Sequence, residues 1–138
     1  MSETRTLASH PVHLGSGAAA VPQPAFTGMD WYEGYVARHG GDGAEGRLVS
    51  SHAFSESWDS WEMHPSGDEL VYLIRGKATM LQEGADGEVA RVRLEAGQYA
   101  INPAGVWHTM DLESGEAEAL FITSGLGTAH RPREKLPL

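Results

Sequence analysis

The chain of 138 residues contains no cysteine. Structural disulfides and thiolate metal sites are therefore excluded, and any transition-metal ligands must be His, Asp or Glu. Basic residues are also scarce: ten Lys and Arg stand against 19 Asp and Glu, which gives a formal net charge of -9. Because general nucleic-acid binding requires a basic face, we expect no nucleic-acid partner.

Long apolar runs are missing as well. The most apolar stretches, such as Leu70 to Ile74, are far too short to span a bilayer, so no membrane partner is expected. The N-terminus, Met1 to Thr6, lacks a basic cluster followed by an apolar core. We therefore predict no signal peptide and expect a cytoplasmic protein.

Helical periodicity is not apparent, because no clear 3.6-residue apolar period continues for three turns. Instead, 17 glycines and seven prolines recur between short apolar runs. This spacing predicts many short strands joined by turns. Such strands must bury their apolar faces against each other, and a jelly-roll barrel achieves this. The expected fold class is all-β, an antiparallel jelly-roll β-barrel.

The chain shows no internal repeat or linker, so we expect one domain, residues 29–125. Residues 1–28, rich in Ser, Ala, Gly and Pro, are expected to form an extended N-terminal arm, and residues 126–138 a surface C-terminal tail. The expected strands cover residues 31–38, 47–54, 58–64, 69–75, 77–82, 88–94, 98–102, 106–112 and 117–123.

The first segment that suggests chemistry runs from Glu62 to Glu69. Residues two apart in a strand point to the same face, so Glu62 and His64 project together. Residues 65–68, Pro-Ser-Gly-Asp, predict a turn that brings Glu69 to the start of the next strand, beside His64. Each residue alone could be a solvated surface group. Their position beside the most apolar strand favours a cavity, where three potential ligands would converge.

The second segment runs from Gly97 to His108. Gly97 and residues 103–105, Pro-Ala-Gly, predict turns on either side of a short strand. His108 then lies early in the following strand, where a position at the rim or inside a cavity is natural.

Together, the two segments resemble the two signature motifs of the cupin superfamily. The first family motif is Gly, five residues, His-x-His, three or four residues, Glu, six residues and Gly. The second is Gly, five residues, Pro-x-Gly, two residues, His, three residues and Asn. The chain matches the first with Glu62, His64, Glu69 and Gly76, and the second with Gly97, Pro103, Gly105 and His108.

The resemblance implies a metal inside the barrel, bound in the family by three His and one Glu. Carried over by position, the ligands are Glu62, His64, Glu69 and His108, and the ion is a divalent Fe, Mn, Ni or Zn. The chain departs from the family at Glu62, where the first His is expected, at Glu56, where a Gly is expected, and at Leu112, where an Asn is expected.

The exchange of His for Glu at position 62 has electrostatic consequences. Two carboxylates and two imidazoles would neutralise a divalent ion. Without an ion, Glu62 and Glu69 should repel each other, which would raise the pKa of at least one. The alternative is that Glu62 turns aside and pairs with an arginine, leaving a pocket without a metal.

The resemblance implies a metal-dependent enzyme that acts on a small organic molecule, with dioxygenase, isomerase and lyase chemistry all compatible. Glu62 could instead be a general base beside a metal with three protein ligands. A non-catalytic small-molecule or metal-sensing binding module is the alternative, and an empty barrel that serves only in assembly is a third.

Other aromatic and histidine residues receive structural interpretations. We expect His52 to be a hydrogen-bonded structural residue, and the tryptophans near the ligands to lie mostly in the core or an interface. Leu70, Tyr72 and Ile74 form an apolar stripe opposite Glu69, which predicts a homodimer. Four histidines in expected loops or tails should be solvated: His10, His13, His39 and His130.

Overall fold

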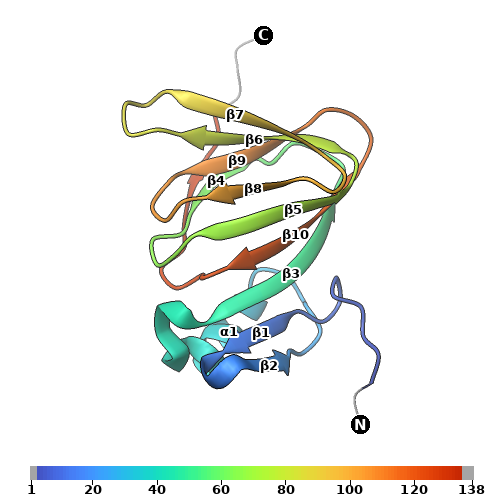
Figure 1. The fold of residues 1–138 in the computed structure, drawn as a ribbon, viewed down its shortest axis with the longest axis vertical. Coiled ribbons are helices and arrows are strands. Elements are labelled where there is room, and N and C mark those ends of the chain that lie inside the picture. The colour runs from blue at the N-terminus through green and yellow to red at the C-terminus, as the bar shows by residue number, and fades with distance from the viewer. Residues whose placement is uncertain (1–2, 135–138) are drawn as a thin grey trace.

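The computed structural model describes residues 3–134, whose strands form two antiparallel sheets (Figure 1). One sheet has the order β2-β1-β3-β10-β5-β8, and the other has the order β11-β4-β9-β6-β7. The first comprises β1 (Val12–Gly15), β2 (Ala19–Pro22), β3 (Arg47–Phe54), β5 (Glu69–Arg75), β8 (Tyr99–Asn102) and β10 (Ala117–Thr123). The second comprises β4 (Ser60–Met63), β6 (Lys77–Glu83), β7 (Val89–Glu95), β9 (His108–Leu112) and β11 (Ala129–Pro132).

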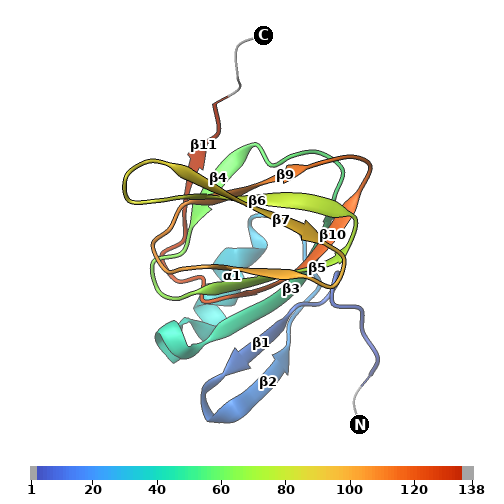
Figure 2. The same cartoon turned by 45° about the horizontal axis from the view of Figure 1, so that its top comes forward.

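The two sheets pack face to face as separate layers (Figure 2). Buried residues of both sheets form one cluster, with Val71 and Leu73 from the six-stranded sheet and Met80 and Met110 from the five-stranded sheet. Alternate residues of β10 are buried, as expected for strands with one face on a core. No described helix is long and apolar enough to cross a membrane.

The expected all-β fold with antiparallel sheets is confirmed. All but one of the expected strands are present, and β3, β5 and β10 have the expected bounds. Among residues 3–134, no strand pairing joins the two sheets, so closure into a jelly-roll barrel stays a prediction.

Both ends of the described chain contribute strands that the sequence did not suggest. β1 and β2 form a hairpin that pairs through β1 with β3, although this segment was expected to be an extended arm. β11, in the expected tail, pairs with β4. The division into arm, domain and tail stays a prediction.

The strand expected at residues 31–38 is wrong, because Trp31–His39 forms the helix α1. Aromatic and β-branched residues favour a strand locally. However, Tyr32, Tyr35, Val36 and His39 have the helical spacing i, i+3, i+4, i+7, and all four line one cavity. Tertiary packing of this face therefore overrides local preference. Two 3-10 turns, η1 (Ser16–Ala18) and η2 (Gly40–Glu45), complete the helical structure described.

Candidate metal centre

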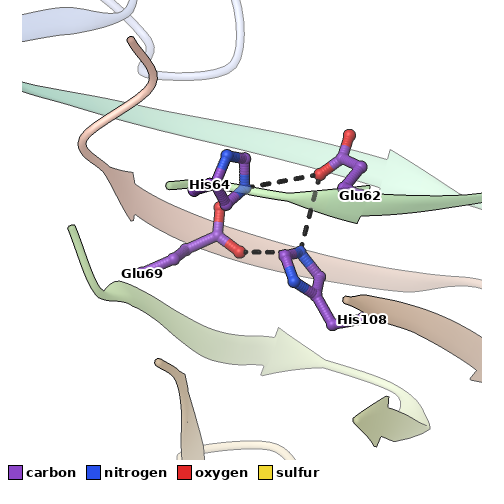
Figure 3. A group of neighbouring side chains, drawn as sticks. All are labelled: Glu62, His64, Glu69 and His108. Carbon is purple, nitrogen blue, oxygen red and sulfur yellow. Dashed lines mark ion pairs between the residues drawn. The ribbon is translucent and has the colours of Figure 1, made fainter. Parts of the chain in front are cut away.

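The structure brings the four candidate ligands together (Figure 3). Each of Glu62, His64, Glu69 and His108 offers one ligand atom, and these atoms all lie within 4.8 Å of one another. Glu62 lies in β4 and His64 directly follows that strand, whereas Glu69 opens β5 and His108 opens β9.

The ligand-bearing strands belong to both sheets. β4 and β9 are paired in the five-stranded sheet, where Glu62 lies opposite His108. β5 lies in the six-stranded sheet. Glu69 opens the next strand and lies beside His64, as predicted. The turn at residues 65–68 carries the chain from one sheet to the other. The cluster therefore lies where the two layers approach each other.

In its neutral form, each histidine directs the lone pair of Nε2 toward the cluster. The hydroxyl of Thr128 donates to the carbonyl of Gly125 at 2.8 Å, so it accepts the hydrogen bond of 2.8 Å from Nδ1 of His64. Nδ1 of His108 lies 3.4 Å from the carbonyl of Val106, which can only accept. Both rings thus carry a proton on Nδ1, which leaves Nε2 to face the cluster. Both Nε2 atoms are buried and have no hydrogen-bond partner within the described residues.

The carboxylate of Glu69 is held rigidly between the two imidazoles. It is 2% exposed, and it accepts hydrogen bonds from Nδ2 of Asn102 at 3.1 Å and from the hydroxyl of Thr123 at 2.6 Å. Its two oxygens each lie 3.2 Å from one Nε2, of His64 and of His108. These are ion-pair distances without the alignment of hydrogen bonds.

Glu62 lies at the open side of the cluster. Its Oε2 is 3.7 Å from Nε2 of His64 and of His108, while its Oε1 accepts a hydrogen bond of 3.2 Å from His130. Within the described part of the chain, Glu62 therefore points at the imidazoles and pairs with no arginine. His130, expected to be solvated, lies in β11 directly opposite Glu62.

The charges of the cluster stabilise one another. Burial lowers the pKa of His108, but Glu62 and Glu69 outweigh this effect and raise it to about 9. Burial raises the pKa of Glu69, but His108 and His64 outweigh it and hold this pKa well below its usual range. The pKa of Glu62 is lowered in the same way. The expected rise in the pKa of one carboxylate is wrong, because the imidazoles outweigh the mutual repulsion.

The donor set fits a divalent cation. Two imidazole nitrogens and two carboxylate oxygens are ligands that suit Mn, Fe, Ni and Zn. The second hydrogen bond of each imidazole is the usual means by which proteins orient histidine ligands. Buried Nε2 atoms without a partner are rare in folded proteins, and a bound cation would satisfy both.

A cavity of about 850 Å³ adjoins the cluster. Glu62, His64 and Glu69 line it, whereas His108 is fully buried behind them. His52 and Trp58 also line the cavity, so the purely structural role expected for His52 does not describe its position.

A second polar cluster lies outside the predicted site, around His13 in β1. Its Nε2 is 2.6 Å from a carboxylate oxygen of Asp42, and its Nδ1 is 2.6 Å from the hydroxyl of Tyr35. The expectation that His13 is solvated is wrong, since it is 1% exposed. Both ring nitrogens are already bonded, so His13 ties β1 to α1 and η2 and has no lone pair left for a ligand. A sequence signal was absent, because these partners are distant along the chain.

Comparisons with known proteins agree with this geometry. The Cupin domain family matches residues 55–125. Oxalate decarboxylase from Bacillus subtilis is 20% identical with a TM-score of 0.51, over 63% of this chain and 23% of that one. An oxalate oxidase in complex with glycolate is 18% identical with a TM-score of 0.56, over 68% of this chain and 50% of that one. The chain thus spans half or less of these two proteins, and they show a shared fold.

The search of curated proteins gave no match. The family match covers 71 of the 138 residues and includes all four residues of the metal-ligand cluster. The chain therefore belongs to the cupin family.

Proposed function

We propose that this protein binds a divalent metal through Glu62, His64, Glu69 and His108, and that it is an enzyme acting on a small organic molecule in the adjoining cavity. The observation that carries this proposal is the pair of buried, unpartnered Nε2 atoms, both directed at one carboxylate. The related fold of oxalate decarboxylase, which has Mn(II) centres, supports the assignment.

The residues divide into two roles. His64, Glu69 and His108 are the buried metal ligands in this proposal. Their side chains are held in place by hydrogen bonds with Thr128, Asn102 and Val106, respectively. A bound metal would supply Lewis-acid chemistry at the end of the cavity. The side chain of Glu62 is 28% exposed, so its outward oxygen can also take a proton from a molecule in the cavity.

Elemental analysis of protein purified without chelator or affinity tag tests the metal. We expect about one equivalent of a divalent transition metal per chain, and its loss in a His64→Ala, His108→Gln double variant. His10→Gln is the matched control, because it changes a histidine outside the cluster. Metal content that is unchanged in the double variant would refute the site.

Catalysis requires a separate measurement. Oxygen uptake and product formation are followed across a panel of small organic compounds, with Glu62→Gln as the variant that keeps the shape of the side chain. Turnover that falls in this variant supports the enzyme. Stoichiometric metal without turnover of any compound would favour a small-molecule or metal-sensing module instead.

We also propose that two copies of the chain pair through the outer face of β5 and β8. Four large apolar side chains are exposed there: Tyr72 (38%), Ile74 (38%), Tyr99 (63%) and Ile101 (42%). β8 is an edge strand, so a second copy can cover this patch and extend the sheet. Light scattering after gel filtration should show a dimer that Ile101→Glu dissociates. Val21→Glu on β2, also exposed, should leave it intact.

A further inference from the structure

The wall of the cavity is mainly apolar and aromatic. Residues from the N-terminal segment, α1, β3, β10 and the β3–β4 loop contribute to it: Phe26, Tyr32, Leu48, Phe54, Trp58 and Phe121. The rings form a chain of contacts, with 5.1 Å between the centroids of Phe26 and His52, and 5.9 Å both from His52 to Phe121 and from Trp58 to Phe121. Such edge-to-face and tilted surfaces favour an aromatic guest.

The acidic side chains that line the cavity disfavour a small dianion. Among residues 3–134, no lysine or arginine lines it, whereas Glu33, Glu62 and Glu69 do. A divalent metal would only neutralise the two carboxylates of the cluster. Burial also lowers the pKa of His52, although Glu62 opposes this effect, so His52 adds no cation at neutral pH. An oxalate-like ligand would therefore find no lysine or arginine among the described residues of the wall.

The polar groups near the cluster are concentrated at one place. Thr128 is hydrogen-bonded to His64, Thr123 to Glu69 and His130 to Glu62. The Tyr35 hydroxyl, further along the wall, is already bonded to His13. A molecule that matches this arrangement has an oxygen-bearing end at the cluster and an apolar body against the rings.

We infer that the cavity takes an uncharged aromatic molecule with a hydroxyl or carbonyl oxygen at one end, and this substrate class rests on the proposed metal-dependent function. The volume of about 850 Å³ agrees, because pockets of this size enclose molecules far larger than oxalate.

Calorimetric titration with 2-naphthol and with oxalate tests the inference, on protein as purified and on protein stripped of metal. We expect 2-naphthol to bind at least about tenfold more tightly than oxalate. His52→Arg, which introduces a cation into the wall, should weaken the binding of 2-naphthol about tenfold and strengthen the binding of oxalate. Val89→Arg, exposed on β7 and outside this cavity, should change neither.

The outcomes separate this inference from the proposed metal site. Binding of 2-naphthol to a protein that takes up no metal supports the substrate class while refuting the metal. Oxalate that binds as tightly as 2-naphthol overturns the substrate class, whatever the metal content. The substrate class is also overturned if His52→Arg changes the affinity for neither 2-naphthol nor oxalate.

Discussion

In the metal-free protein, Glu62→Gln should lower the pKa of His108 from about 9 toward the ordinary value of 6.5. Burial alone disfavours the imidazolium, so the raised pKa depends on the carboxylates of Glu62 and Glu69. Removing the charge of Glu62 keeps the size of the side chain and leaves Glu69 as the remaining acidic partner.

The magnitude follows from the pKa shift. A pKa of about 9 in the folded state, against 6.5 unfolded, corresponds to about 3 kcal/mol of folding free energy. Because the folded pKa is raised, this stabilisation is fully present below pH 6.5 and is lost as the pH rises through about 9. Glu62→Gln should remove about 1 to 2 kcal/mol of it at pH 6.5.

Two assays check this prediction. Nitrogen NMR of the imidazoles gives the pKa of His108 directly, and urea unfolding at pH 6.5 and pH 9 gives the change in stability. Glu116→Gln is the control, since that exposed carboxylate pairs with Arg75 away from the cluster. The reasoning is refuted if His108 titrates near pH 6.5 in the parent protein, or if Glu62→Gln leaves its pKa at about 9.

Three further predictions concern the same structure. Asn102→Ala removes a buried donor to Glu69 and should destabilise the protein by about 1 to 3 kcal/mol in urea unfolding; an unchanged midpoint would contradict this. Gly76→Ala places a Cβ 2.6 Å from a backbone carbonyl oxygen at φ +89° and should cost about 3 kcal/mol in thermal unfolding. Gly97→Ala, at φ +90° in open space, should cost only about 1 kcal/mol, and equal losses would refute the steric explanation. Metal binding near pH 7.5 should release about one proton from His108, measured by calorimetry in buffers of different ionisation enthalpy, and no release would count against its protonation.

Much of the sheet structure could be predicted because its signals are local. Glycines and prolines separate the strands, and β3, β5 and β10 begin and end where the sequence suggests. The helix α1 could not be predicted in this way, because its aromatic residues favour a strand until the cavity that they line is known. β1 and β11 likewise depend on partners far away in the chain.

The candidate ligands could be predicted from spacing, but their surroundings could not. The interval from His64 to Glu69 holds a turn, and His108 follows a second one. By contrast, Thr128 and His130 approach the cluster only because the end of the chain returns to β4. No short-range pattern marks such long-range contacts.

Part of the cavity wall comes from a segment of the chain that precedes the metal-ligand cluster. The cluster is inside residues 55–125, which match the Cupin domain, whereas Phe26, Tyr32 and Leu48 precede that region. Mutations in the segment that precedes the Cupin domain can thus change which compound binds, while the metal-ligand cluster stays intact. Exchanging residues 26–54 between relatives would be a direct way to alter selectivity in this architecture.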